Sequence, residues 1–217
     1  RGDWDVTGRA GLRFEASDTV SFRAAAYRGL RVPTLNELYR PFVIFPVVTQ
    51  ANAALEPEKL WGYEIGADWK TEHTRLSLTA FDNRLENAVA NVTLTPVLRQ
   101  RRNLDAVRAR GLELDGEARW GAFSARASIA FTDATVEGTG AAAPLDGNRP
   151  PQVAEIAGGA TLAWRPGEGA EVALTVRHVG DQFESDQETD MLPAATTLGA
   201  FAQIPLTERL SLVLRGE

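Results

Sequence analysis

The segment from Leu60 to Lys70 alternates regularly between apolar side chains and small or polar ones. One side carries Trp61, Tyr63, Ile65, Ala67 and Trp69, and the other carries Gly62, Glu64, Gly66, Asp68 and Lys70. A period of two predicts a β-strand whose two faces meet different surroundings. A soluble sheet buries the apolar face in a core, whereas a membrane barrel turns it outward to lipid and lines a wet lumen with the polar face.

The same alternation returns along the rest of the chain, which predicts about ten strands in total. The further segments are residues 6–15, 20–27, 75–81, 111–120, 123–132, 155–164, 171–177, 196–204 and 209–215. Tight links, such as 16–19 and 71–74, alternate with long connections, such as 29–57 and 138–151. Strands joined in this way form an antiparallel up-and-down meander, so the chain is predicted to be all-β.

Strand length and loop asymmetry favour the membrane geometry. The segments approach the roughly 9–11 residues that cross a bilayer when tilted, whereas soluble strands are most often about 5–6 residues long. Outer-membrane barrels place short turns at one end and long loops at the other. Trp120 and Phe123 flank one short turn and Trp164 precedes another, as in an interfacial aromatic girdle. A soluble up-and-down barrel with an apolar interior remains the alternative.

The alternation also predicts which side chains face lipid and which face the lumen. The residues expected to face lipid, here called the apolar set, are Trp61, Tyr63, Trp69, Leu112, Leu114, Phe123 and Ile129. The residues expected to face the lumen, here called the polar set, are Glu64, Asp68, Glu113, Asp115, Glu117, Arg126 and Arg177.

Composition narrows the classes of function. No run of about 18 apolar residues exists, which excludes a helical membrane protein. The chain has no cysteine, so it has neither disulfides nor a thiolate metal site. The net charge of −6 argues against a nucleic-acid partner. The first four residues, Arg-Gly-Asp-Trp, do not resemble a signal peptide, so we expect a mature, truncated or excised chain.

Four blocks of residues follow one another in the order known from a receptor family. They are Tyr27–Tyr39 (YRGLRVPTLNELY), Asn52–Glu58 with Tyr63–Gly66, Arg102-Asn103 with Arg110–Leu114, and Arg177–Phe183. Each block is loose alone, but together they cover nearly the whole chain and resemble the TonB-dependent outer-membrane receptors.

The resemblance implies uptake of a scarce nutrient, such as a ferric siderophore or cobalamin, across the bacterial cell outer membrane. The complete fold would be a transmembrane barrel of about 22 strands with a plugged lumen. Residues 1–217 would then be part of the barrel domain, without the plug domain and the last strand. The implied partners are outer-membrane lipid and lipopolysaccharide, the TonB complex through the plug, and a small-molecule chelate. A passive porin, a barrel-only adhesin and a soluble β-barrel binding module remain alternatives.

Candidate ligand contacts lie in the long connections. Thr34 and Glu37 fit a capping box that begins a short helix. The weak candidates for ligand binding are Arg31, Asn36, Tyr39, Arg101 and Arg149. The basic run Arg99, Arg101 and Arg102 could attract an anionic chelate, but we expect it to pair with Glu113 and Glu117 of the polar set.

We expect no catalytic, metal or cofactor site. The acids of residues 181–190 lack the glycine and the terminal Glu of an EF-hand loop, so we expect them to be solvated or bridged by divalent cations to lipopolysaccharide. The two histidines, His73 and His178, lie far apart in the sequence. No nucleophile–base pattern accompanies the acids of the polar set, which argues against an enzyme.

Overall fold

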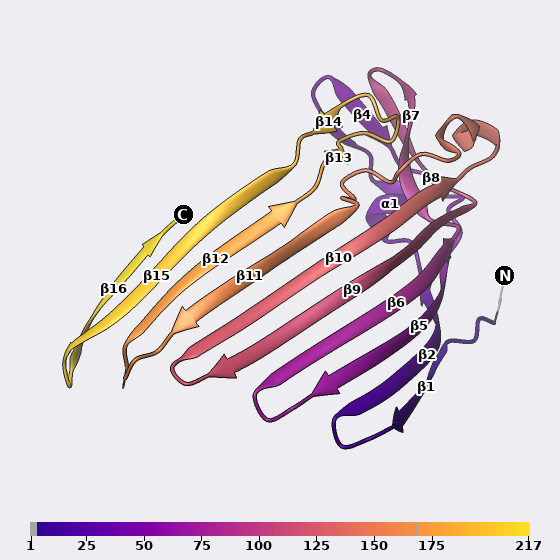
Figure 1. Ribbon diagram of the computed structural model, residues 1–217. Coiled ribbons are helices and arrows are strands. Elements are labelled where there is room, and N and C mark those ends of the chain that lie inside the picture. The colour runs from indigo at the N-terminus through magenta and orange to yellow at the C-terminus, as the bar shows by residue number, and fades with distance from the viewer. Residues whose placement is uncertain (1–3, 168) are drawn as a thin grey trace.

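Ten antiparallel strands lie side by side in one sheet (Figure 1). The computed structural model describes residues 4–167 and 169–217. The order of the strands in the sheet is their order in the chain, which confirms the predicted meander. The strands are β1 (Gly8–Glu15), β2 (Val20–Arg31), β5 (Glu58–Lys70), β6 (Thr74–Glu86), β9 (Ala106–Trp120), β10 (Phe123–Glu137), β11 (Ile156–Trp164), β12 (Glu171–Val179), β15 (Ala195–Thr207) and β16 (Leu210–Gly216).

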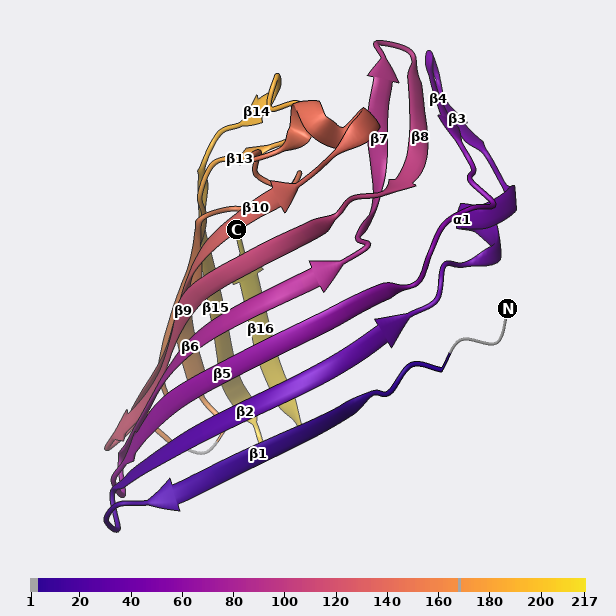
Figure 2. The same ribbon diagram turned by 90° about the vertical axis from the view of Figure 1, so that its right-hand side faces the viewer.

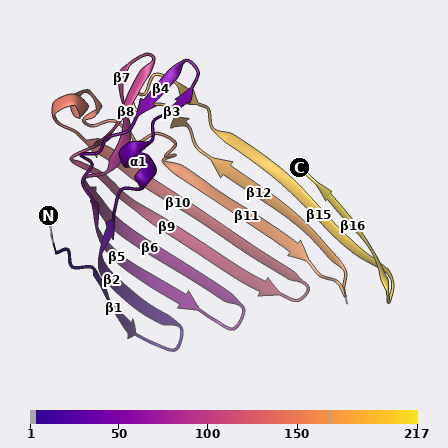
Figure 3. The ribbon, with the colours of Figure 1, turned by 180° about the vertical axis from the view of Figure 1, so that it is seen from behind.

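The connections are short at one end of this sheet and long at the other (Figures 1 and 3). One two-residue link joins β9 to β10 through Gly121, whose positive φ of 56° suits a residue without a side chain. The last short turn lies at 208–209, not at 205–208 as the sequence suggested. Pro205 instead belongs to β15, beside a register shift between Pro205 and Thr207, where proline is tolerated in a strand.

The long connections carry their own secondary structure, here called the crown and defined as residues 32–57, 87–105, 138–155 and 180–194. Residues 29–31 of the predicted connection 29–57 extend β2, and the remainder contains one helix and two strands. The crown elements are α1 (Leu35–Tyr39), β3 (Phe42–Ile44), β4 (Val47–Gln50), β7 (Val89–Thr95), β8 (Leu98–Asn103), the 3₁₀ helix η1 (Gly140–Leu145), β13 (Gln182–Phe183) and β14 (Met191–Leu192). No helix of the described residues is long and apolar enough to cross a membrane.

The large sheet is curved, so that β1 and β16 both lie to the same side of the middle strands (Figure 2). Within the described residues, β1 and β16 each pair on one side only and form the two edges of the sheet. Unpaired edges are what a barrel removes by closing on itself.

The sheet has no conventional apolar core. Ile65, Leu114 and Ile129 are 65%, 44% and 51% exposed although they lie in the middle of long strands. The main cluster of buried apolar side chains lies at the crown and not under the sheet. An exposed apolar face of this extent is typical of a surface that contacts another protein or a membrane.

Candidate functional site

The strand register brings the polar set together on one face of the large sheet. Residues directly opposite each other in antiparallel strands share a face. Asp68 lies opposite Ser77, and Ser77 lies opposite Asp115. The same row continues through Ser128 and Gly159 to Arg177 of β12. The other members of the set occupy neighbouring rows of this polar face.

The apolar set occupies the opposite face, with Leu78, Leu114 and Ile129 in one continuous row. At the short-turn end of this apolar face the rings of Trp120 and Phe123 stack with centroids 6.0 Å apart. Phe123 stacks in turn on Trp164 at 6.3 Å. The predicted aromatic row is therefore present beside the short turns.

Hydrogen bonds join the polar side chains of β2, β5 and β6. The guanidinium of Arg23 donates to Asp68 and to Thr79, and Ser77 donates to Asp68 at 2.8 Å. Gly66 lies beneath the guanidinium, and a Cβ at this position would fall 2.6 Å from its central carbon. Glycine therefore makes room for the arginine to reach across β5.

A second crossing uses Tyr27. Its hydroxyl donates to Glu64 at 2.9 Å and lies 2.8 Å from the amide oxygen of Asn83. The ring passes over Gly62, where a Cβ would lie 2.1 Å from a ring carbon. The glycines within the alternating segment of β5 thus have a packing role that the sequence pattern alone did not reveal.

Arg126 and Glu117 of the polar set also pair, with a 3.5 Å contact, and Glu117 accepts a hydrogen bond from Arg119 at 2.6 Å. The expected pairing of Glu117 with the basic run 99–102 is therefore wrong. That run belongs to β8, in the crown, while Glu117 lies near the short-turn end of β9. Arg101 uses its guanidinium to cap the carbonyls of Asn36 and Arg40 instead.

Two long connections of the crown merge into one four-stranded sheet in the order β3-β4-β8-β7. β4 and β8 pair in parallel through Val48 and Leu98, Thr49 and Arg99, and Gln50 and Gln100. The Asn52 side chain donates to the Arg101 carbonyl at 3.0 Å. Residues 32–57 and 87–105 therefore form one folded body.

The predicted capping box is present at α1. Thr34 accepts a hydrogen bond from the Glu37 backbone N–H, and the Glu37 carboxylate accepts one from the Thr34 N–H at 2.7 Å. Arg31 donates to Glu37 and to Glu58. Burial opposes ionisation of Glu37, but hydrogen bonds from Thr34 and Arg31 outweigh it and hold the pKa of this carboxyl below its usual range.

Asp186 links two other connections. Its carboxylate accepts hydrogen bonds from the backbone N–H of Thr93 at 2.9 Å and from the Thr93 hydroxyl at 2.7 Å. Its carbonyl accepts from the Asn148 side chain at 3.0 Å. Arg149 donates its backbone N–H to Glu188 at 2.6 Å and lies over the ring of Phe183 at 5.3 Å.

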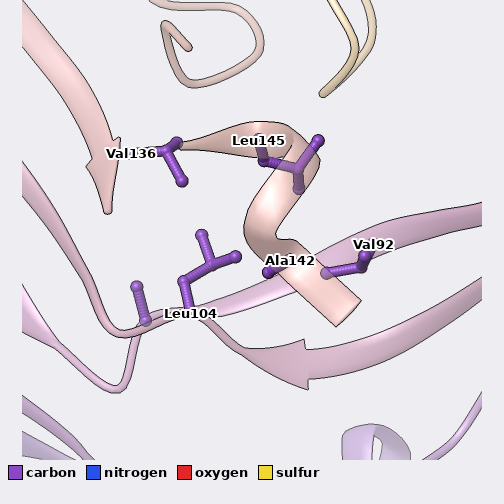
Figure 4. Close-up of a cluster of buried hydrophobic side chains, with 6 residues drawn as sticks. Val92, Leu104, Val136, Ala142 and Leu145 are labelled. Atoms are coloured by element: carbon purple, nitrogen blue, oxygen red, sulfur yellow. The ribbon is translucent and has the colours of Figure 1, made fainter. Parts of the chain in front are cut away.

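A small apolar cluster completes the crown (Figure 4). Val92 and Leu104 meet Val136 from the end of β10 and Ala142 and Leu145 from η1. Val92 is 1% exposed. Hydrogen bonds and this cluster together unite all four long connections.

Asp186 and Glu188 are therefore partners of neighbouring connections, which corrects the expectation that these two acids are solvated. Among the described residues no group of His, Cys, Asp and Glu side chains is arranged to hold a metal ion. Three of the five weak ligand candidates are held by contacts. Arg31, at the end of β2, donates to Glu58 and to Glu37, and Arg101 and Arg149 are held within the crown. Asn36 contributes its carbonyl to Arg101, and Tyr39 is 67% exposed.

Sequence reasoning missed the tip of the β3–β4 hairpin. Val43, Ile44 and Phe45 are 62%, 72% and 92% exposed there. The signal was the run Phe42–Val48, which is almost wholly apolar yet lies within a connection. This tip is the most exposed apolar feature of the crown.

Comparison with known proteins decides the family. The family model described as "TonB dependent receptor-like, beta-barrel" matches residues 1–217. The chain belongs to this family of TonB-dependent receptor β-barrels. Such receptors are proteins of the bacterial outer membrane, which confirms the predicted localisation and contradicts the soluble alternative.

Known relatives agree in sequence and fold. The chain is 24% identical over 218 residues to "Vitamin B12 transporter BtuB" of Vibrio vulnificus (strain YJ016), covering 96% of this chain and 32% of the transporter. The ferric yersiniabactin uptake receptor FyuA of Yersinia pestis superposes with a TM-score of 0.74 at 16% identity, over 96% of this chain and 31% of the receptor.

A second solved structure gives the same result. The siderophore receptor PiuA of Acinetobacter baumannii has a TM-score of 0.74 at 17% identity, over 96% of this chain and 31% of the receptor. The chain thus spans about a third of the length of these family members.

Proposed function

We propose that this chain forms part of the barrel wall of a TonB-dependent receptor that takes up a scarce nutrient, of the ferric siderophore or cobalamin type. The polar set lines the lumen and the apolar set meets lipid. The partners are the TonB complex, reached through a plug domain elsewhere in the receptor, and the nutrient itself. Residues 1–217 serve as a partial barrel domain.

The observation that carries the proposal is the division of one ten-stranded sheet into a polar face and an exposed apolar face, with a folded crown at one end. Charges that are paired and hydrogen-bonded, as Arg23 and Asp68 are, suit a wet wall rather than a core. A crown whose connections are held together by hydrogen bonds and packing suits the entrance of a barrel, where a ligand binds before transport. We assign the chain no catalytic role.

The cargo contact is assigned to the hairpin tip and Tyr39 rather than to the basic run. Two of the three arginines expected to attract an anionic chelate already have partners in the crown. Arg101 donates to backbone carbonyls, and Arg102 donates to the Gln100 side chain. Phe45 and Ile44 offer apolar contact area, and Tyr39 adds an amphipathic ring. This chemistry suits a bulky, partly apolar chelate.

The test is uptake by the complete receptor in a bacterial strain that lacks its other receptors of this type. Radiolabelled cyanocobalamin and a panel of ferric siderophores are supplied at nanomolar concentrations, with TonB present or deleted. We expect saturable uptake of one cargo that disappears without TonB. Uptake that rises linearly with concentration and ignores TonB would identify a passive porin and refute the proposal.

The hairpin tip is tested in the same assay. Phe45→Ala with Ile44→Ser should raise the half-saturating cargo concentration several-fold and leave the amount of receptor in the membrane unchanged. The matched control is Leu198→Ala on the apolar face of the barrel wall, where Leu198 is 71% exposed. Equal behaviour of the tip variant and the wild type would place the cargo contact elsewhere.

A further inference from the structure

The chain passes between the large sheet and the crown at four points around the first two long connections. The connection 32–57 leaves β2 after Arg31 and returns to β5 at Glu58, and these two residues are the last opposed pair of the two strands. The connection 87–105 leaves β6 after Glu86 and returns to β9 at Ala106. The position of both connections on the sheet therefore depends on the contacts at these four passages.

Glu58 holds three of the four passages. The residue is only 6% exposed. Its carboxylate accepts hydrogen bonds from the Arg31 guanidinium and from the backbone N–H of Val89 at 2.7 Å. A buried carboxylate is costly without such partners, so the three groups stay together. The Arg31 guanidinium also donates to Glu37 of the capping box at 3.0 Å, which joins the start of α1 to the same group of contacts.

Asn103 holds the remaining passage, at the end of the connection 87–105. Its side-chain amide donates to the carbonyls of Glu56 at 3.0 Å and Asn87 at 2.6 Å. Its side-chain oxygen accepts from the backbone N–H of Glu56 at 2.9 Å. Both N–H donors of the amide are used, so an asparagine fits here better than an acid of the same size. Asn103 therefore binds the end of one connection to the beginning of the same connection and to the end of the other.

The residues that make these contacts are here called the junction. They come from three of the four blocks that carry the family resemblance and from the start of the connection 87–105. The junction consists of Arg31, Glu56, Glu58, Asn87, Val89 and Asn103. Arg31, which the sequence suggested as a ligand contact, is part of a structural clamp.

The hairpin tip is rigidly linked to the junction. The β3–β4 hairpin belongs to the connection 32–57, and β4 pairs in parallel with β8 of the connection 87–105. The Asn52 side chain donates to the Arg101 carbonyl, which adds a second bond between the two connections. A displacement at the base of either connection is therefore transmitted to the tip.

We propose that Glu58 and Asn103 are positioning residues that fix the hairpin tip relative to the barrel wall. Neither residue contacts the cargo, and each acts through the connections that it holds. Loss of either lets the two connections take several positions on the sheet, which weakens cargo binding and leaves the later steps of transport unchanged. The positioning rests on the proposed function only for this effect on cargo.

The first test measures uptake by the complete receptor. Glu58→Gln keeps the shape but replaces one accepting oxygen by a donor, and Asn103→Asp keeps the acceptor and loses both donors. Each should raise the half-saturating cargo concentration at least fivefold and change the maximal uptake rate per receptor less than twofold. The matched controls are Glu171→Gln, whose carboxylate pairs with Arg165 at the short-turn end, and Asn91→Ala at an exposed position of β7. Both controls should change the half-saturating concentration less than twofold.

A combined variant separates positioning from general damage. In a receptor that already carries Phe45→Ala with Ile44→Ser, the addition of Glu58→Gln should raise the half-saturating concentration less than twofold further, because the contact that Glu58 positions is already lost. Independent effects that multiply in the combined variant would overturn the proposal.

A second test needs no cargo. Spin labels are attached at Glu72→Cys in the β5–β6 turn and Val97→Cys in the β7–β8 turn, two exposed positions, in the complete receptor freed of other cysteines. The distribution of distances between the labels should be narrow in the wild type and in Glu171→Gln, and broad in Glu58→Gln and Asn103→Asp. Broad distributions in a receptor that takes up nothing would refute the proposed function and support the positioning of the tip.

The contrary results are equally specific. A distribution of wild-type width in both variants would overturn the proposal, whatever the receptor transports. Heat-modifiable gel mobility reports whether each variant is folded. If Glu58→Gln does not assemble, Asn103→Asp provides the same test through neutral hydrogen bonds. Failure of both variants to assemble would mean that these residues act in folding, which would also overturn the positioning role.

Discussion

A charge introduced on the apolar face should cost far more stability than the loss of a charge one residue away on the polar face. Leu114 lies six residues from Trp120 and four from Arg110, which mark the two ends of the apolar stretch of β9. At about 3.4 Å per residue and a tilt of about 40°, it is about 16 Å from one boundary and about 10 Å from the other. Leu114 is therefore close to the bilayer midplane.

The magnitude follows from this depth. Leu114→Arg should lower the free energy of unfolding by about 2–4 kcal/mol, the cost of an arginine on the lipid face at the midplane. Glu113→Gln keeps the side-chain shape on the opposite face and should cost no more than about 1 kcal/mol. Leu112→Arg, nearer the headgroups, should cost less than Leu114→Arg.

Reversible denaturant unfolding of the complete receptor in lipid vesicles measures all three variants, with equal m-values as the condition for comparing them. If Glu113→Gln is clearly more damaging than Leu114→Arg, the assignment of the two faces is wrong for β9. If Leu112→Arg costs as much as Leu114→Arg, the depth argument fails.

Three other predictions concern the crown and the polar face. Asp186→Ala should leave the Thr93 backbone N–H without its partner and lower the stability of the crown by about 1–3 kcal/mol. Amide hydrogen exchange should become faster at Thr93 and stay the same in the middle of β10. Unchanged exchange at Thr93 would contradict the linking role of Asp186. Because the folded pKa of Glu37 lies below its ordinary value of 4.5, its stabilisation is fully present above about pH 4.5 and is lost as the pH falls through the folded value. The stability difference between wild type and Glu37→Gln, read from exchange in α1, should therefore shrink in acid, and a difference that grows there would refute the assignment. Gly62→Ala should destabilise the receptor by about 1–3 kcal/mol through overlap with the Tyr27 ring, and Tyr27→Ala in the same chain should remove most of that penalty in a double-mutant cycle.

The period-two pattern was sufficient to predict the strands of the large sheet, because the geometry of a single strand determines which of its side chains share a face. The alternation along Leu60–Lys70 identifies the side chains that share a face. The short links are long enough only for antiparallel pairing of consecutive strands. The capping box at Thr34 and Glu37 was readable for the same reason, since its hydrogen bonds join residues three apart.

The fold of the crown could not be predicted from the sequence, because its contacts join residues far apart in the chain. The parallel pairing of β4 with β8 links Thr49 to Arg99, and Asp186 reaches back to Thr93. No periodicity encodes such partners. The partners of Arg101 could not be predicted from the sequence because they are backbone carbonyls, which every residue carries.

The positions of Gly62 and Gly66 show a further limit of the pattern. In the sequence both count only as small residues on the polar side of a strand. In the structure they are the places where Tyr27 and Arg23 cross β5 to reach acceptors on the neighbouring strands. The need for glycine arises from the partner strand and not from the strand that carries it.

The most direct test of the central claim measures the surroundings of successive residues along β10. The chain has no native cysteine, so single cysteines at positions 124 to 131 can be spin-labelled in an otherwise cysteine-free complete receptor in lipid vesicles. The account predicts that labels at 125, 127, 129 and 131 collide with dissolved oxygen. Labels at 124, 126, 128 and 130 should be shielded from oxygen and more accessible to a water-soluble nickel chelate. A flat accessibility profile, or alternation in the opposite phase, would contradict the claim that one face of this sheet meets lipid and the other lines the lumen.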